Sequence, residues 1–242
     1  MALKIFVDFD GTITTRDVGN ALFREFGGAA CDAYIAEYHN ERISARELFR
    51  REAAAAGSIL PAELHAFLDR QAIDPGFKDF VSFCRDREIE FHIVSDGLEY
   101  YIDRVLRVHG IQGVSYVANT LELKPSGDDG RAVLSLSFPN GDSVCDRCAS
   151  CKRNFMLTHA GDEDIIVFIG EGYSDRCPAQ YADIVFAKDK LQTFCQQENI
   201  SYYLYATFHD VTERLTELLG RRQLRKRRRA ELKRREAFLR ES

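Results

Sequence analysis

Two carboxylates stand two residues apart near the start of the chain, in the segment Asp8-Phe9-Asp10-Gly11-Thr12. In an extended segment, side chains at positions i and i+2 point to the same side. Two acids at that distance repel each other unless a proton or a cation intervenes, and Mg²⁺ is a cation that prefers oxygen ligands. Gly11 allows the backbone to turn sharply next to them. The pattern favours metal-assisted chemistry at Asp8 and Asp10, although a plain Asp-Gly turn has the same sequence.

Two later segments carry groups suited to holding an anion. Ser95-Asp96-Gly97 follows a short apolar run. A hydroxyl with backbone N–H groups at such a strand-to-helix turn suits an anionic oxygen, and a helix N-cap is the alternative interpretation. Lys152 begins a predicted helix, where an ammonium group would neutralise the charge of a phosphate. A solvated surface lysine is the alternative there.

A second pair of acids follows the apolar run Ile165–Ile169. Glu171 and Asp175 lie four residues apart, and Gly170 and Gly172 on either side of Glu171 permit an irregular loop. Acids at this spacing can both reach one ion or its water ligands. We therefore expect a second contribution to the same metal site.

Alternating strands and helices explain how these groups come together. Strand patterns are followed by helical patterns, which predicts a parallel sheet with helices on both faces. In such a sheet, ligands bind at the carboxyl ends of the strands, where the acids, the serine and the lysine are expected. The predicted strands are 3–9, 91–94, 165–169, 184–186 and 202–205, and the predicted helices are 77–87, 99–109, 152–159, 175–182, 191–198 and 211–219.

Two segments depart from this alternation. Residues 16–75 are helical in pattern, with a capping-box sequence from Ser44 to Glu47 and with Pro61 suited to a first helical turn. Residues 121–139 show two period-2 segments around a Gly- and Asp-rich turn, which predicts a β-hairpin. The expected fold is α/β, a Rossmann-like doubly wound parallel sheet with an inserted α-helical cap and a small β-hairpin. The expected domains are a core of 1–15 and 76–219, a cap of 16–75 and a basic tail of 220–242.

Composition places the chain among ordinary globular proteins. Of 242 residues, 45% are hydrophobic and 29% are charged, which excludes collagen-like, fully disordered and disulfide-scaffold classes. Apolar runs are far shorter than the ~20 residues that span a bilayer, so we expect no membrane partner. An acid at position 8 argues against a signal peptide. We therefore expect a cytoplasmic protein whose cysteines are reduced.

The net charge of −5 is unevenly distributed. From Arg221 to Ser242 there are 11 Lys and Arg against 3 Glu, a net charge of +8, so the other 220 residues carry −13. A basic segment of this kind attracts nucleic acid, anionic lipid or an acidic partner, whereas the plainer interpretation is a solvated extension. Weak contact of the tail with a polyanion is therefore one hypothesis.

Taken together, the four motifs resemble those of the haloacid dehalogenase superfamily. The helical insertion after the first motif resembles the subfamily that includes phosphoserine phosphatase. The resemblance implies a phosphoric monoester hydrolase that uses Mg²⁺ and an aspartyl-phosphate intermediate. The motifs are Asp8-Phe9-Asp10-Gly11-Thr12, then Ser95, then Lys152, then Glu171 with Asp175.

The cysteines before Lys152 indicate which phosphatases within the family this sequence resembles. Cys145-x-x-Cys148-x-x-Cys151 followed by lysine is similar to the methylthiopentenyl-phosphate phosphatase group, and Asp175-x-Cys177-Pro is similar to phosphoethanolamine/phosphocholine phosphatases. The three cysteines have three interpretations. They are a loop of reduced thiols, a zinc site that needs a fourth ligand, or a redox group.

The resemblance also assigns roles to residues. Asp8 is the expected nucleophile, and Asp10 is the expected general acid and base. Expected substrate contacts are Asp17, an acid where phosphoserine phosphatases bind the substrate amine, and Arg50. The expected phosphate ligands are Thr12, Ser95, Asp96, Gly97 and Lys152, and the expected metal ligands are Asp8, Asp10, Glu171 and Asp175.

Some residues depart from the subfamily pattern. Glu171 stands where an Asp is usual, and Ser174 stands where an Asn is often found. Glu52 occupies the position of the cap arginine that holds the substrate carboxylate in phosphoserine phosphatases, which makes phosphoserine a less suitable substrate. The leading hypothesis is hydrolysis of a small phosphorylated metabolite. The alternatives are phosphoserine or phosphoethanolamine/phosphocholine phosphatase activity, and a catalytically weak protein that binds a phosphorylated ligand or a polyanion.

Overall fold

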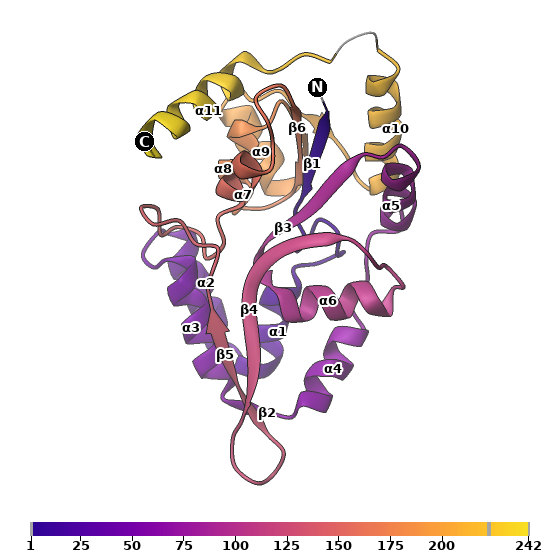
Figure 1. Ribbon diagram of the computed structural model, residues 1–242. Helices are drawn as coiled ribbons and strands as arrows, with labels where there is room; N and C mark the ends of the chain where they lie inside the picture. Colours follow the sequence, from indigo (N-terminus) through magenta and orange to yellow (C-terminus); the bar gives the residue numbers. More distant parts are fainter. Residues whose placement is uncertain (1, 222–223, 242) are drawn as a thin grey trace. The chain divides into compact units, whose positions relative to one another are not determined.

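The computed structural model describes residues 2–221 and 224–241, which form two compact units (Figure 1). The first unit comprises residues 1–13, 73–94 and 152–242, and the second comprises residues 14–72 and 95–151. The chain therefore passes between the units four times. The predicted insertion, 16–75, lies largely in the second unit, which also includes 95–151.

The first unit is built on a parallel sheet in which β1 lies between β3 and β6 (Figure 1). The order of its strands is β3-β1-β6-β7-β8, and each neighbouring pair is parallel. Its last strand, β8, is a two-residue edge strand. The strands are β1 (Leu3–Val7), β3 (Glu90–Leu98, whose residues from Ser95 on belong to the second unit), β6 (Ile165–Gly170), β7 (Ile184–Ala187) and β8 (Tyr203–Leu204).

Helices cover both faces of this sheet. Figure 1 shows α5 and α10 on one side of β1 and β3, and α7, α8 and α9 on the other. Phe77, Phe80 and Phe208 pack ring against ring between α5 and α10, with ring centroids 5.0–6.1 Å apart. The helices are α5 (Phe77–Asp86), α7 (Lys152–Thr158), α8 (Arg176–Tyr181), α9 (Asp189–Gln197), α10 (Phe208–Leu219) and α11 (Arg228–Glu241).

The central strands contain the continuous apolar runs that are typical of strands buried on both faces, residues 5–7 in β1 and residues 165–169 in β6. Ile5, Phe6 and Val7 of β1 are fully buried, and so is every residue of β6. The two strands end together, because the N–H of Asp8 donates to the carbonyl of Ile169 at 2.9 Å. Polar residues that follow β1 and β6 therefore begin at one edge of the sheet, as the sequence predicted.

The second unit combines four consecutive helices with an antiparallel sheet of order β2-β5-β4 and with α6. Its hairpin confirms the predicted one, with β4 beginning six residues earlier than expected. As predicted, the Ser44 hydroxyl accepts from the N–H of Glu47, and Pro61 begins α4. The elements are α1 (Val18–Gly27), α2 (Ala30–His39), α3 (Ala45–Ala56), β2 (Ser58–Ile59), α4 (Pro61–Asp69), α6 (Glu99–Val108), β4 (Ser115–Pro125) and β5 (Ala132–Ser137).

The basic tail contains a helix, α11, that packs on α8 in the first unit (Figure 1). The guanidinium of Arg227 donates to the carbonyls of Ala179 and Gln180 at 2.7 and 2.9 Å, at the carboxyl end of α8. Arg234 binds Asp183 at 3.0 Å, and this carboxylate also accepts from the N–H of Arg227. These arginines satisfy helix-end carbonyls that have no partner within the helix. Residues 222, 223 and 242 of the tail lie outside the described residues.

No helix among the described residues is both long enough and apolar enough to cross a bilayer.

Candidate active site

Asp8 occupies the end of β1, where its side chain is almost fully buried. One carboxylate oxygen, Oδ1, accepts from the Lys152 ammonium at 2.5 Å, and Oδ2 accepts from the Thr12 hydroxyl at 3.1 Å. The structure thus brings together three of the predicted residues, from β1, the following loop and the start of α7.

The loop after Asp8 turns back on itself at Gly11. Its N–H groups at Thr12 and Ile13 both donate to the carbonyl of Phe9. Gly11 has a φ of 72°, a conformation that side chains disfavour, and a Cβ there would lie 2.9 Å from Oε1 of Glu171. Only glycine therefore lets Glu171 pack over the loop that carries Asp8 and Asp10.

Lys152 is the cation at the centre of the site. It begins α7, and its side chain is 1% exposed. The ammonium binds Asp8 Oδ1, Asp175 Oδ1 at 2.6 Å and the Ser174 hydroxyl at 3.0 Å. Ser174, which stands where a related sequence often has Asn, is therefore part of the lysine's environment.

Asp175 organises the loop after β6. Its Oδ1 atom accepts from Lys152, and its Oδ2 atom accepts from the N–H groups of Glu171 and Gly172, each at 2.9 Å. Gly170 makes room for this carboxylate, because a Cβ there would lie 2.6 Å from Asp175 Oδ2. Both carboxylate oxygens of Asp175 therefore accept hydrogen bonds from protein groups.

Negative charge exceeds positive charge around Asp8. Burial, followed by the repulsion of Asp175, raises the pKa of Asp8 well above its usual value, although Lys152 opposes the shift. Burial alone would lower the pKa of Lys152, but Asp175 and Asp8 raise it, so the ammonium stays charged. Burial, with the charges of Asp175 and Asp189, raises the pKa of Glu171 to about 7. Lys190 and Lys188 oppose the shift at Glu171, yet its pKa stays raised.

The serine motif belongs to the second unit. The Ser95 side chain is buried and accepts from the N–H of Gly97 at 2.9 Å. The Asp96 carboxylate accepts from the N–H groups of Ala149 and Ser150 at 2.8 and 2.7 Å. Asp96 therefore anchors the loop that leads to Lys152, a contact that no sequence pattern indicated.

Residues expected to contact substrate also lie in the second unit. Asp17 caps α1 by accepting from the N–H of Asn20 at 2.7 Å, and Arg50 is exposed, with its guanidinium over the ring of Phe138. Glu52 is buried, and within the described residues its Oε1 atom has no hydrogen-bond partner. Burial and the charge of Asp17 raise the pKa of Glu52 to about 8.

The three cysteines before Lys152 form no disulfide among the described residues. Cys145 is exposed, and Cys148 and Cys151 are half-buried. No group of three His, Cys, Asp or Glu side chains suited to a metal ion occurs in the part of the chain that the structure describes. Their loop is held instead by backbone contacts, such as the bond from the Cys151 N–H to the Asn140 carbonyl at 2.7 Å. The structure thus gives the zinc interpretation no support.

Sequence reasoning missed Tyr205, which follows the edge strand β8. The residue is 3% exposed, and its hydroxyl donates to the carbonyl of Gly170 at 3.2 Å. Its oxygen is also in contact with the Thr12 hydroxyl, to which it can donate in place of the Gly170 carbonyl. A tyrosine in a short strand pattern resembles any core aromatic, so its sequence carried no signal of this contact.

Comparison with known proteins decides the family. The model of the haloacid dehalogenase-like hydrolase family matches residues 5–180. This chain belongs to that family. The resemblance drawn from the four motifs is therefore confirmed, and so is the prediction that the chain is a hydrolase.

Curated relatives are similar over nearly the whole chain. A 2-hydroxy-3-keto-5-methylthiopentenyl-1-phosphate phosphatase of Bacillus cereus is 29% identical over 228 residues, covering 91% of this chain and 99% of the relative. A protein of the same name from Bacillus thuringiensis (strain Al Hakam) is also 29% identical, covering 90% and 98%. The matched relatives are thus phosphatases that align with this chain over almost their whole length.

Solved structures confirm the predicted fold. A phosphoserine phosphatase, solved as a phospho-aspartyl intermediate analogue, has a TM-score of 0.67 at 15% identity, covering 88% of this chain and 98% of that chain. A haloacid dehalogenase family hydrolase of Salmonella enterica has a TM-score of 0.65 at 18% identity, covering 86% and 69%.

Proposed function

We propose that this chain is a Mg²⁺-dependent phosphomonoesterase that hydrolyses a small phosphorylated metabolite through an aspartyl-phosphate. One observation carries the proposal. The buried carboxylate of Asp8 stands at the end of β1, between a lysine ammonium at 2.5 Å and a threonine hydroxyl at 3.1 Å. Both groups can donate to the oxygens of a phosphoryl group, and a carboxylate is a competent nucleophile toward phosphorus.

The reaction has two steps. In the first, an Asp8 oxygen bonds to phosphorus as the bond from phosphorus to the ester oxygen breaks, and Asp10 gives that oxygen its proton. In the second, Asp10 takes a proton from water as the water oxygen attacks phosphorus. This attack releases inorganic phosphate and restores the Asp8 carboxylate. Lys152 and Thr12 stabilise the negative charge of the transferring group in both steps.

A divalent cation fits the residues present. The pKa of Glu171 stays raised, at about 7, although Lys190 and Lys188 oppose the shift, so a further cation would supply charge compensation that this carboxyl lacks. Asp8, the backbone carbonyl of Asp10 and Glu171 would hold Mg²⁺. Asp175, which accepts from Lys152 and from the N–H of Glu171, would orient both and would ligate the ion directly or through water. Bound Mg²⁺ supplies positive charge that lets an anionic phosphate approach an anionic nucleophile.

The proposed substrate class follows from the relatives. Because they are named 2-hydroxy-3-keto-5-methylthiopentenyl-1-phosphate phosphatase, we propose that ester, or a similarly small one, as the first to test. Phosphoserine, phosphoethanolamine and phosphocholine are the alternatives. Glu52 is an acid with a raised pKa, so it offers no positive charge to a substrate carboxylate. Proposed contacts of the substrate with Ser95, Asp96, Gly97, Asp17 and Arg50 rest on the sequence resemblance.

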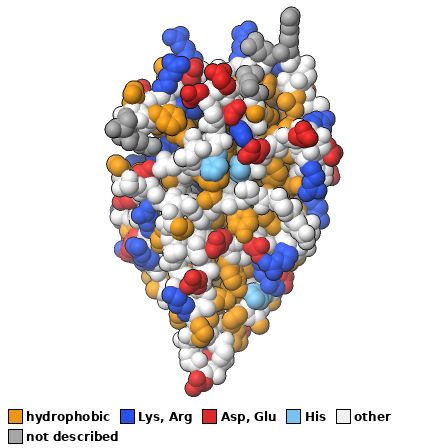
Figure 2. Space-filling model, in the orientation of Figure 1, with side chains coloured by type: hydrophobic (Ala, Val, Ile, Leu, Met, Phe, Trp, Pro, Cys, Tyr) orange, Lys and Arg blue, Asp and Glu red, His pale blue; other side chains and the backbone are white. Residues whose placement is uncertain are grey.

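The second hypothesis, polyanion binding by the tail, has less support. Arg227 and Arg234 donate hydrogen bonds to carbonyls of α8 in the first unit, and Arg234 also forms an ion pair with Asp183. On the face drawn in Figure 2, Lys and Arg side chains are interspersed with Asp and Glu, and no basic patch dominates it. Weak contact with a polyanion would depend on the exposed tail residues Arg221, Arg225, Arg228, Arg229 and Arg235.

Hydrolysis of a panel of phosphate esters tests the proposal. We expect phosphate release with Mg²⁺, none above background with EDTA, and none from Asp8→Asn. Asp162→Asn, which changes an exposed acid of the same unit, is the matched control and should retain wild-type activity. Equal background rates for wild type and Asp8→Asn across the panel would refute the proposal. Low-salt binding of RNA that disappears on truncation after Gly220 would instead favour the polyanion hypothesis.

A further inference from the structure

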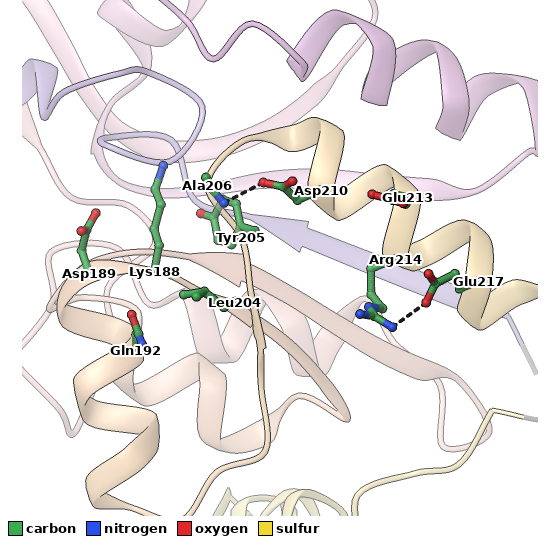
Figure 3. A pocket seen from close by; sticks show the side chains of 10 residues that line it. All are labelled: Lys188, Asp189, Gln192, Leu204, Tyr205, Ala206, Asp210, Glu213, Arg214 and Glu217. Atoms are coloured by element: carbon green, nitrogen blue, oxygen red, sulfur yellow. Dashed lines mark hydrogen bonds and ion pairs between the residues drawn. The ribbon is translucent and has the colours of Figure 1, made fainter.

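Tyr205 joins the candidate active site to a surface groove of the first unit. The groove has a volume of about 780 Å³ and lies beside α9 and α10. Figure 3 shows Tyr205 next to Lys188 and Ala206 in its lining. The Lys188 ammonium lies 5.0 Å from the centroid of the Tyr205 ring. The Phe208 ring packs edge to face with it, at a distance of 6.3 Å between ring centroids. The ring is therefore fixed by its neighbours.

The hydroxyl of this ring reaches two of the elements that form the site. It donates to the carbonyl of Gly170, the residue directly before Glu171. The tyrosine oxygen is also in contact with the Thr12 hydroxyl, which itself donates to Asp8 Oδ2 at 3.1 Å. Because each hydroxyl has one proton, Tyr205 shares its proton between the Gly170 carbonyl and the Thr12 oxygen while Thr12 donates to Asp8. Asp8 Oδ1 is bound by Lys152, so Oδ2 is the oxygen whose orientation depends on Thr12.

We propose that Tyr205 is a positioning residue for phosphoryl transfer. Its hydroxyl holds Thr12 and the end of β6 in register, and through Thr12 it orients the Asp8 carboxylate for attack on phosphorus. This inference rests on the proposed function. Small displacements of a nucleophile slow the chemical step more than they weaken binding, because the reacting atoms must lie within a narrow range of distances. The loss of the Tyr205 hydroxyl should therefore lower kcat rather than raise KM.

Tyr205→Phe tests the inference because it removes one oxygen and keeps the ring. We expect kcat to fall by about tenfold, with KM changed by less than about twofold and with a Tm close to wild type. Tyr203→Phe is the matched control. It changes a half-buried tyrosine of β8 that stacks on Phe186, at a centroid distance of 5.5 Å, and it should leave kcat unchanged.

A double-mutant cycle separates positioning from a structural effect. Tyr205→Phe should cost about tenfold in kcat in the wild type but less than about twofold in Thr12→Val, because the path to Asp8 is already lost there. An equal loss in both backgrounds would overturn the inference, and so would a wild-type kcat for Tyr205→Phe in an active enzyme. A wild-type protein that hydrolyses no phosphate ester would refute the proposed function, and the inference with it.

Discussion

Replacing Glu52 by glutamine should remove a pH dependence of stability that this one buried carboxyl imposes. Its pKa is about 8 in the folded protein, against 4.5 for the free side chain. The folded state therefore binds the proton more tightly, and the group's stabilising contribution is complete only below pH 4.5. That contribution is lost as the pH rises through about 8. At 1.36 kcal/mol per pH unit, the loss between about pH 5 and about pH 9 is on the order of 4 kcal/mol.

Thermal unfolding across this pH range measures the effect. Glu52→Gln and wild type should unfold at similar temperatures near pH 5, where both side chains are neutral. Near pH 9 the variant should be more stable by roughly 10 °C. Glu63→Gln, at an exposed position of α4 in the same unit, is the control and should follow the wild type. Parallel curves for wild type and Glu52→Gln would refute the reasoning, since they would mean that Glu52 titrates alike in both states.

Three further changes test other contacts. Lys152→Met leaves Asp8 and Asp175 buried without their cation. It should therefore destabilise the protein by about 3–5 kcal/mol and abolish turnover. Wild-type stability in a denaturant titration would contradict this. Gly11→Ala should lower the stability of the folded protein by about 1–2 kcal/mol and raise the Mg²⁺ concentration needed for half-maximal activity, because the added Cβ displaces Glu171. An unchanged Mg²⁺ titration would argue against Glu171 as a ligand. Asp183→Asn should lower stability by about 2 kcal/mol because it weakens the bonds of this side chain to Arg234 and Ile166. Glu236→Gln is the control and should leave stability unchanged. Equal melting temperatures for Asp183→Asn and wild type would show that other contacts hold α11.

Local patterns predicted most of the fold. The mainly apolar run of β1 and the continuous one of β6 identified buried parallel strands, and the acids after them identified the edge that carries the site. The two-residue strand β8 lies within the predicted strand 202–205, but β2 was not predicted, because it is too short to show a period and its pairing depends on β5. The capping box from Thr207 to Asp210, which starts α10 three residues before the predicted helix, was also missed.

Contacts between distant segments account for what the sequence could not show. The resemblance assigns Asp96 to the phosphate site, and that stays a prediction, but nothing in the sequence showed that its carboxylate also accepts from N–H groups more than 50 residues away. Two arginines of the tail, Arg227 and Arg234, looked solvated because the charge pattern has no apolar stripe, but their partners include carbonyls at the end of α8. Backbone groups carry no side-chain signature, so no pattern of residue types reveals them as partners.

The central claim is that the Asp8 carboxylate becomes phosphorylated during turnover. Rapid acid quenching of the enzyme with Mg²⁺ and a ³²P-labelled substrate, followed by peptide mapping, tests it most directly. If Asp8 is the nucleophile, acid-stable, base-labile label will be found on the peptide that contains Asp8, and none on that peptide in Asp8→Asn. Label on a serine or histidine peptide, or turnover of labelled substrate by Asp8→Asn at the wild-type rate, would contradict it.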